Sequence, residues 1–250
     1  MEEKFLSCKC ITYGRVKMLE EAIQSFLQQD YPADKCELVI VNDYPLQILE
    51  YNHPQIRIFN LHKTFDTIGA KENFATEQCK GEIILQWDDD DIALPNHLQN
   101  VNKFFTEESD LLHWHRAVYM DMPIMRSITG VGNSGIVYSK RIWREMGGYP
   151  LENAGHDMSF VVKIKSISKN IVFAEPKDEE VSWVYCWGGR GYHLSGAGTD
   201  TPDRPNIIQR HGAYIESERL KGNIPIGIIK LNPHWNFDYT QKLKDLINVG

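Results

Sequence analysis

Four consecutive aspartates, Asp88, Asp89, Asp90 and Asp91, directly follow an apolar, strand-forming run and are the strongest chemical signal in the sequence. Like charges at this spacing repel unless water, a helix N-terminus or a cation offsets them. On an extended backbone, Asp88 and Asp90 would share one side and the other two aspartates the opposite side. Paired carboxylates suit Mg²⁺ or Mn²⁺. The alternative is a solvated acidic loop whose last members cap the next helix.

The segments around the aspartates predict an α/β sheet. Apolar, β-branched runs and apolar residues at helical spacing indicate strands at 5–12, 37–41, 56–61 and 82–87, and helices at 19–27 and 70–79. This order is typical of a doubly wound, mostly parallel (mixed) sheet with helices on both faces. Such sheets bind ligands beyond the carboxyl ends of their strands, where Asp43 and the four aspartates fall. This placement favours the cation site over the solvated loop.

The second half of the sequence is less regular. Its patterns predict helices at 97–105, 139–146 and 157–168, and strands at 111–119 and 171–174. The Gly-rich, aromatic segment 183–203 is expected to be a mobile loop over the site. Because the sequence shows no repeat, low-complexity tract or linker, we expect one domain over residues 1–250.

Composition bounds the class of protein. The 250 residues include 42% hydrophobic residues and carry a net charge of −7, so we expect a globular chain without affinity for nucleic acid or for an anionic membrane. The N-terminal residues lack the pattern of a secretory signal, and no apolar run has the length of a membrane span. The five cysteines form no CxxC pair and are expected to be reduced. We therefore expect a cytoplasmic protein with at most peripheral contact with the inner face of a membrane; the sequence predicts no oligomeric state.

Two strings around the aspartates resemble the central signature of one enzyme family. The string IGAKEN at 68–73 precedes KGEIILQWDDDD at 80–91. This order of an asparagine-bearing helix, a Gly-Glu strand and a DxD motif resembles the family 2 glycosyltransferases with the GT-A fold. Three further strings are similar to the N-terminal third of that family: TYGR at 12–15, QDYP at 29–32 and VIVND at 39–43. The resemblance covers residues 5–98.

The resemblance implies an inverting, metal-dependent glycosyltransferase with the GT-A fold. Residues 1–98 would form the nucleotide-binding half of the domain and 99–250 the acceptor-binding half. The enzyme would move a sugar from a nucleotide-sugar donor, with a UDP-sugar expected, to a glycan or lipid-linked acceptor in surface polysaccharide synthesis. Mn²⁺ or Mg²⁺ would neutralise the charge that grows on the leaving nucleoside diphosphate.

The resemblance also assigns roles to residues. Asp43 would accept a hydrogen bond from the base, although it could instead cap a turn, and Arg15 could be an ordinary surface residue. The donor site would comprise Thr12, Tyr13, Arg15, Asp43, Lys71, Asn73, Asp88, Asp89 and Arg190. The metal ligands would come from Asp88, Asp90, Asp91 and His193. Which of Asp90 and Asp91 the metal prefers stays open.

An inverting transferase needs a carboxylate that takes the proton of the acceptor hydroxyl. In the resembled family this is the aspartate of a Glu-Asp pair that follows a Gly-Gly-Tyr/Phe-Pro segment. Here GGYP at 147–150 is followed by GHD at 155–157, so the resemblance implies Asp157 as the base. The alternative is that Asp157 caps the helix that starts at Met158. Both roles are compatible.

The Gly-rich segment contains further candidates. His193 resembles a C-terminal histidine that completes the metal shell in some members of the family, and Arg190 could bind the diphosphate. A lone histidine is as readily structural. Trp183 and Trp187 could stack on sugar or base, or pack in the core.

Two residues depart from the family pattern. Glu72 stands where many relatives carry arginine, and His156 replaces the glutamate of the Glu-Asp pair. A catalytically silent glycosyltransferase-like domain that binds nucleotide or glycan is therefore one alternative function. A sugar nucleotidylyltransferase is another, but residues 11–17 (ITYGRVK) lack its Gly-rich, basic phosphate loop.

Overall fold

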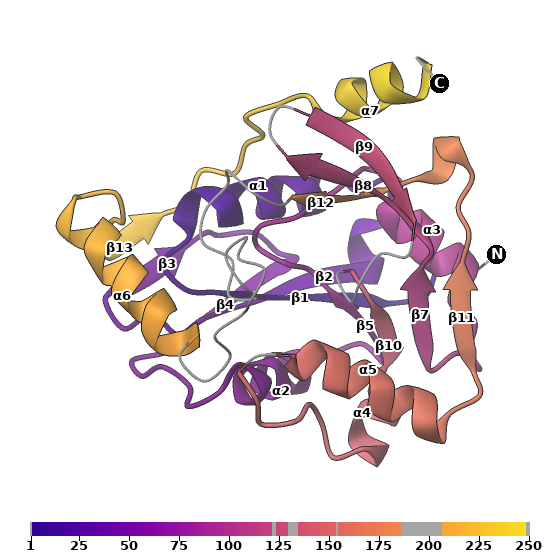
Figure 1. Cartoon of the computed structure of the whole chain (residues 1–250), viewed down its shortest axis with the longest axis horizontal. Coiled ribbons are helices and arrows are strands. Elements are labelled where there is room, and N and C mark those ends of the chain that lie inside the picture. Colours follow the sequence, from indigo (N-terminus) through magenta and orange to yellow (C-terminus); the bar gives the residue numbers. More distant parts are fainter. Residues whose placement is uncertain (1, 122–123, 130–134, 154, 187–206, 249–250) are drawn as a thin grey trace.

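The computed structural model describes residues 2–121, 124–129, 135–153, 155–186 and 207–248. Its main sheet has seven strands in the order β11-β7-β10-β5-β1-β2-β4 (Figure 1). These strands are β1 (Leu6–Thr12), β2 (Cys36–Asn42), β4 (Ile56–Asn60), β5 (Ile83–Gln86), β7 (Leu111–Trp114), β10 (Val137–Ser139) and β11 (Ile171–Ala174). All neighbours pair in parallel except β10, which is antiparallel to both β5 and β7. The predicted mixed, mostly parallel sheet is confirmed.

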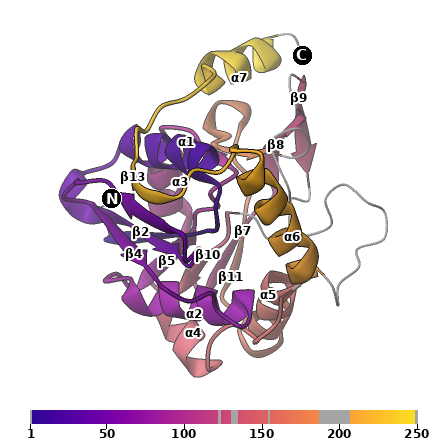
Figure 2. The same ribbon diagram turned by 90° about the vertical axis from the view of Figure 1, so that its left-hand side faces the viewer.

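Helices cover both faces of this sheet, as predicted. Helices α1 (Val16–Leu27) and α3 (His97–Phe104) lie on one face. Helices α2 (Ile68–Gln78), α4 (Lys140–Glu145) and α5 (His156–Ile167) lie on the other, as the perpendicular view in Figure 2 also shows. Strands β1 and β2 are buried along almost their whole length because both faces are covered, which explains their nearly continuous apolar runs.

Two smaller sheets flank the main one. The first has the order β6-β12-β8-β9, and the second pairs β13 with β3. Their strands are β3 (Gln47–Glu50), β6 (Ile92–Ala93), β8 (Arg116–Asp121), β9 (Ile124–Thr129), β12 (Trp183–Cys186) and β13 (Gly227–Lys230). The remaining elements are the helices α6 (Ile207–Leu220) and α7 (Tyr239–Asn248) and the short 3-10 turns Ala33–Lys35 and Asp178–Glu180.

The structure corrects two sequence-based expectations. The predicted strand 111–119 is two strands, β7 and β8, which belong to different sheets. The predicted mobile loop 183–203 begins with strand β12, in which Trp183 is 2% exposed and lies opposite Ala93. Burial of the WVYC residues in a sheet stabilises this segment, so Trp183 packs in the core and does not contact sugar or base.

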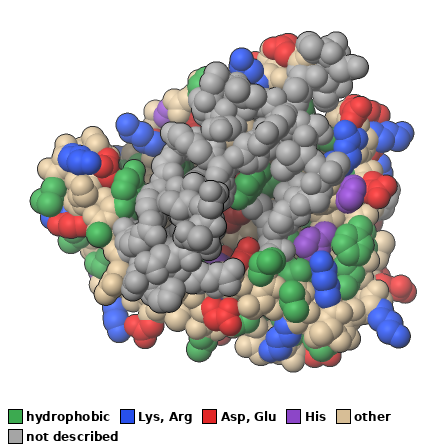
Figure 3. All heavy atoms as spheres, in the orientation of Figure 1, with side chains coloured by type: hydrophobic (Ala, Val, Ile, Leu, Met, Phe, Trp, Pro, Cys, Tyr) green, Lys and Arg blue, Asp and Glu red, His purple; other side chains and the backbone are tan. Residues whose placement is uncertain are grey.

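The surface carries charges of both signs. On the face in Figure 3, acidic and basic side chains are interspersed around the periphery with hydrophobic side chains between them. Within the described residues, no helix combines the length and the apolar character that crossing a bilayer requires.

One core contact predicts how stability depends on pH. His97 is fully buried against the rings of Trp87, Trp114 and Trp183, and its Nδ1 lies 2.9 Å from Ser182 Oγ. Burial lowers the pKa of His97 to about 3. The unfolded chain therefore binds this proton first as the pH falls below about 6.5, and the folded state loses stability from there down to pH 3.

At pH 5, this histidine should cost about 2 kcal/mol of the free energy of unfolding relative to pH 7.5. A His97→Gln variant, which keeps a hydrogen-bonding group but does not titrate, should lack that part of the loss. Urea unfolding of both proteins at the two pH values measures the difference. Equal losses in the two proteins would show that His97 does not titrate as inferred.

Candidate active site

Three adjacent strands bring the predicted residues to one edge of the main sheet. Strands β5, β1 and β2 are neighbours and parallel, so their carboxyl ends meet at the same edge. Thr12 is the last residue of β1, Asp43 follows β2, and Asp88 lies two residues beyond β5. The topology thus positions side chains that are far apart in the sequence.

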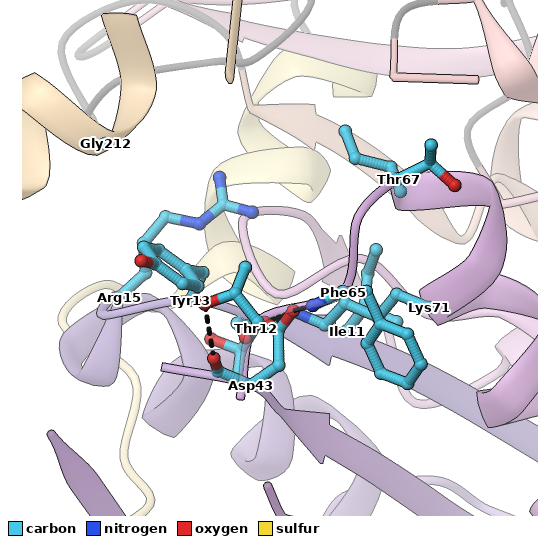
Figure 4. Close-up of a pocket in the computed structure, with 11 residues that line it drawn as sticks. Ile11, Thr12, Tyr13, Arg15, Asp43, Phe65, Thr67, Lys71 and Gly212 are labelled. Carbon is cyan, nitrogen blue, oxygen red and sulfur yellow. Dashed lines mark hydrogen bonds and ion pairs between the residues drawn. The ribbon is translucent and has the colours of Figure 1, made fainter. Parts of the chain in front are cut away.

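A pocket opens at this edge. It is lined by five of the predicted donor-site residues: Thr12, Tyr13, Arg15, Asp43 and Lys71. In Figure 4 Thr12, Asp43 and Lys71 lie close together, with Thr67 and Gly212 of α6 at opposite sides. The loop after β4 contributes Thr64, Phe65 and Thr67, which sequence analysis missed. The sequence could have indicated these residues, because the loop follows a strand predicted to be parallel and therefore starts at the same edge of the sheet.

A buried lysine, Lys71, links Asp43 to the backbone of Thr12 at the bottom of the pocket. Lys71 Nζ forms an ion pair with Asp43 and donates a hydrogen bond to the carbonyl oxygen of Thr12 at 2.7 Å. The backbone N–H of Phe65 donates to the other Asp43 oxygen at 3.0 Å. These contacts fix the Asp43 carboxylate, which keeps further acceptor positions for a ligand N–H.

Arg15 bridges two of the four aspartates. Its Nη1 lies 2.8 Å from Asp90 Oδ2 and its Nε lies 3.1 Å from Asp89 Oδ2. The predicted strict alternation of the four side chains is therefore wrong. Strand β5 ends at Gln86, and Asp89 and Asp90 lie in a turn, so both can reach one guanidinium. Arg15 is mostly buried and paired, which excludes the ordinary surface role.

The other two aspartates face different surroundings. Asp88 Oδ1 accepts a hydrogen bond from Gln86 Nε2 at 2.7 Å, and Asp91 Oδ1 accepts one from the backbone N–H of Cys186 in β12 at 2.8 Å. Burial, with the nearby Asp90 charge, raises the pKa of Asp88 to about 7 and holds that of Asp91 well above its usual range. Burial also raises the pKa of Asp89 to about 6, although Arg15 opposes this rise. The single positive charge of Arg15 thus does not offset the negative charge of the four carboxylates.

These surroundings fit a divalent cation better at Asp88 and Asp90 than at Asp91. Hard cations prefer carboxylate oxygens, and the Asp90 side chain is 14% exposed beside Arg15. Asp91 is turned toward β12 and is 2% exposed. Within the described residues, no three Asp, Glu, His or Cys side chains form a preformed metal cage. A cation would therefore need ligand oxygens from a bound diphosphate as well.

Asn73 does not lie in the pocket, contrary to prediction. Its Oδ1 accepts hydrogen bonds from the backbone N–H of Tyr149 at 2.6 Å and from Trp143 Nε1 at 3.0 Å, and its Nδ2 donates to the Tyr149 carbonyl at 3.0 Å. Gly148 has a φ of 90°, and a Cβ there would lie 2.4 Å from Asn73 Oδ1. Asn73 therefore holds the GGYP turn against α2.

The GGYP turn leads to α5, where Asp157 lies in the first helical turn. The N-cap of this helix is Gly155, with a φ of 76° and no side-chain cap, so the alternative that Asp157 caps a helix starting at Met158 is wrong. Within the described part of the chain, the Asp157 side chain makes no hydrogen bond. Its carboxylate is therefore available to a ligand.

Three predicted residues, Trp187, Arg190 and His193, lie outside the described residues.

Known proteins resemble this chain in sequence and in fold. The sequence model for "Glycosyl transferase family 2" matches residues 9–153, which is more than half of the chain. The chain is 32% identical over 108 residues to the poly(ribitol-phosphate) beta-N-acetylglucosaminyltransferase TarS of Staphylococcus aureus, covering 40% of this chain and 19% of TarS. It is 30% identical over 113 residues to the uncharacterized glycosyltransferase YwdF of Bacillus subtilis, covering 43% of this chain and 40% of YwdF. The match thus spans well under half of either relative.

Solved structures share the fold. The structure of S. aureus TarS 1-349 in complex with UDP-GlcNAc superposes with a TM-score of 0.61 at 17% identity, over 97% of this chain and 71% of that chain. The mannosyltransferase PcManGT from Pyrobaculum calidifontis, in complex with GDP-Man and Mn²⁺, superposes with a TM-score of 0.60 at 15% identity, over 88% of this chain and 65% of that chain. These likenesses show the GT-A fold.

Proposed function

Because the chain belongs to glycosyl transferase family 2, we propose that it transfers a sugar from a UDP-sugar to a hydroxyl group of a glycan or lipid-linked acceptor in surface polysaccharide synthesis. The observation that supports this most is the pocket of Thr12, Asp43 and Lys71, which lies beside the aspartate cluster at the ligand edge of the sheet. The S. aureus TarS structures in complex with UDP-GlcNAc and with UDP support the choice of donor.

The pocket residues suit the nucleoside of the donor. Asp43, held by Lys71 and by the Phe65 N–H, would accept the N–H of a uracil base. Tyr13, whose ring centroid lies 4.9 Å from that of Tyr44, offers an aromatic surface for the base. The roles of Thr12, Tyr13, Asp43 and Lys71 in donor binding are thus proposed together.

Asp88 and Asp90 are suited to bind the cation that accompanies the diphosphate, and Arg15 is suited to bind the diphosphate itself. Asp88 and Asp90 would hold Mn²⁺ or Mg²⁺, and Arg15 would donate charge-assisted hydrogen bonds to the diphosphate. When bound, the cation would supply Lewis-acid stabilisation of the negative charge on the departing UDP. Asp89 would keep Arg15 in place from its buried position.

Asp157 would act as the general base of an inverting displacement. Its carboxylate would take the proton of the acceptor hydroxyl as the hydroxyl oxygen bonds to the anomeric carbon. The bond between that carbon and the β-phosphate oxygen would break on the opposite side, and UDP would leave. A single displacement of this kind inverts the configuration at the anomeric carbon.

A nucleotide-sugar panel tests the proposal. We expect UDP and UDP-sugars with Mn²⁺ to raise the melting temperature, because a ligand that binds only the folded state stabilises it by an amount that grows with the ratio of ligand concentration to Kd. We also expect slow hydrolysis of one of the UDP-sugars without acceptor. Binding without any turnover of UDP-glucose, UDP-galactose or their N-acetyl forms would favour the catalytically silent alternative. Indifference to every nucleotide would refute the nucleotide site.

A further inference from the structure

A buried lysine lies in the middle of strand β1, inside the main sheet. Lys9 of β1 is 0% exposed, and its Nζ forms an ion pair with Glu72 of α2. Nζ also lies 2.6 Å from Gln86 Oε1, at the end of β5, and 4.7 Å from the centroid of the Tyr149 ring. Burial of an ammonium group is costly unless it is paired and hydrogen-bonded. A lysine as the one charged residue in the predicted strand 5–12 was the sequence signal for this group.

The ammonium fixes which way the Gln86 amide points. An ammonium group has only donors, so it must meet the amide oxygen of Gln86 and would repel the amide NH₂. The NH₂ group is thereby turned to the other side, where it donates to Asp88 Oδ1 at 2.7 Å and to Glu72 Oε1 at 3.1 Å. A flipped amide would lose all three contacts. Lys9 therefore stabilises, together with the two carboxylates, the amide orientation in which Asp88 receives a donor.

We infer that Lys9 is a positioning residue of the donor site, which acts through the Gln86 amide to hold Asp88 in the orientation that binds the metal and diphosphate. This inference rests on the proposed function, because it assigns Asp88 to that site. Oδ1 of Asp88 accepts this hydrogen bond, and Oδ2 accepts none from the residues that the structure describes. The carboxylate is thus held in one orientation before any ligand binds, which reduces the ordering cost of binding.

The same network extends toward the proposed base. Glu72 Oε1 lies 3.8 Å from His156 Nε2, and His156 is the residue before Asp157 in α5. Lys9 holds the Glu72 carboxylate, since their ion pair lowers the pKa of Glu72 to about 2 despite burial. The two departures from the family pattern, Glu72 and His156, therefore belong to one network with Lys9. This network connects Asp88, in the proposed donor site, to helix α5, which bears Asp157.

A paired substitution separates positioning from folding. Lys9→Met/Glu72→Gln removes both charges at similar volume and leaves no buried ion unpaired, so the fold should persist. Without the ammonium, the Gln86 amide oxygen loses the donor that holds it, so the hydrogen bond from the amide to Asp88 is less firmly fixed. We expect the Kd for UDP in the presence of Mn²⁺ to rise by about tenfold or more, the amount that loss of a partner behind a metal ligand commonly costs. The Kd for UDP without Mn²⁺ should not change. Calorimetric titration of the purified variant measures both.

Two further variants make the outcome decisive. Gln86→Met removes the amide but keeps the Lys9–Glu72 pair, and we expect its effect on the Kd with Mn²⁺ to be non-additive with that of the paired substitution, because both act through one contact. Arg57→Met/Glu37→Gln removes another partly buried ion pair, between β2 and β4, and should leave the Mn²⁺ dependence intact. An unchanged Kd in Lys9→Met/Glu72→Gln, or additive effects with Gln86→Met, would overturn the inference. Wild-type protein that binds no UDP with Mn²⁺ would instead overturn the proposed function, and the role of Lys9 with it.

Discussion

Asp157→Asn is expected to lower kcat for sugar transfer by a factor of about 10²–10⁴, the range that a positioned general base contributes. The Kd for UDP should stay unchanged, because Asp157 lies on α5 and does not line the nucleotide pocket. The fold should tolerate the change well, since the Asp157 side chain makes no hydrogen bond within the described residues. The favourable position of a carboxylate in the first helical turn is worth only about 0.3–1 kcal/mol.

The control for this prediction is Glu152→Gln. Glu152 is an exposed acid in the same GGYP-to-α5 connection, and its Oε2 accepts a hydrogen bond from Ser159 Oγ at 2.9 Å. Its loss should leave kcat within about twofold, as for most surface substitutions. Transfer of sugar from a radiolabelled UDP-sugar, followed over time in both variants, measures the two rates. Full activity in Asp157→Asn would exclude Asp157 as the base.

The sequence predicted the location of the site because its evidence is local to each strand. Each apolar run ends abruptly at a polar residue, as at Thr12, Asp43 and Asp88, and in parallel sheets such ends meet. The order of the main-sheet strands and of helices α1 and α2 in the first 98 residues was also predicted, whereas the short strands β3 and β6 were missed. The pairing of β13 with β3 was not predictable, because it joins segments that are distant in the chain and each is short.

The errors within the site have equally local causes. Lys71 and Asn73 both belong to α2, but two residues turn a helix by about 200°, so they face nearly opposite sides. Lys71 therefore reaches the pocket while Asn73 holds the GGYP turn. The prediction that the aspartates alternate between two sides was wrong because it required the strand to continue beyond Gln86, where the chain turns instead. Motif position alone could not distinguish these faces.

Asp90→Asn is expected to abolish the Mn²⁺ dependence of UDP binding and to reduce transfer to near the limit of detection. Asp90 is a partly exposed carboxylate beside Arg15 and Asp88, and we propose that its oxygens bind the cation of the diphosphate. Its charge also raises the pKa values of Asp88 and Asp91. Removal of that charge relieves repulsion from Asp88 and Asp91 but also removes the ion pair with Arg15, so the melting temperature without metal should change little.

Asp91→Asn provides the matched comparison, because it makes the same chemical change one residue away. Asp91 is turned toward β12 and accepts the Cys186 N–H, a contact that an asparagine oxygen can also make. We expect Asp91→Asn to leave the Kd for UDP in the presence of Mn²⁺ unchanged. If this substitution has an effect, we expect it to change the melting temperature. Titrations of both variants with UDP, with and without Mn²⁺, decide between the two aspartates. If Asp91→Asn lost the Mn²⁺ dependence and Asp90→Asn kept it, the metal would bind on the β12 side, and Arg15 would be left as the permanent counterion of Asp90.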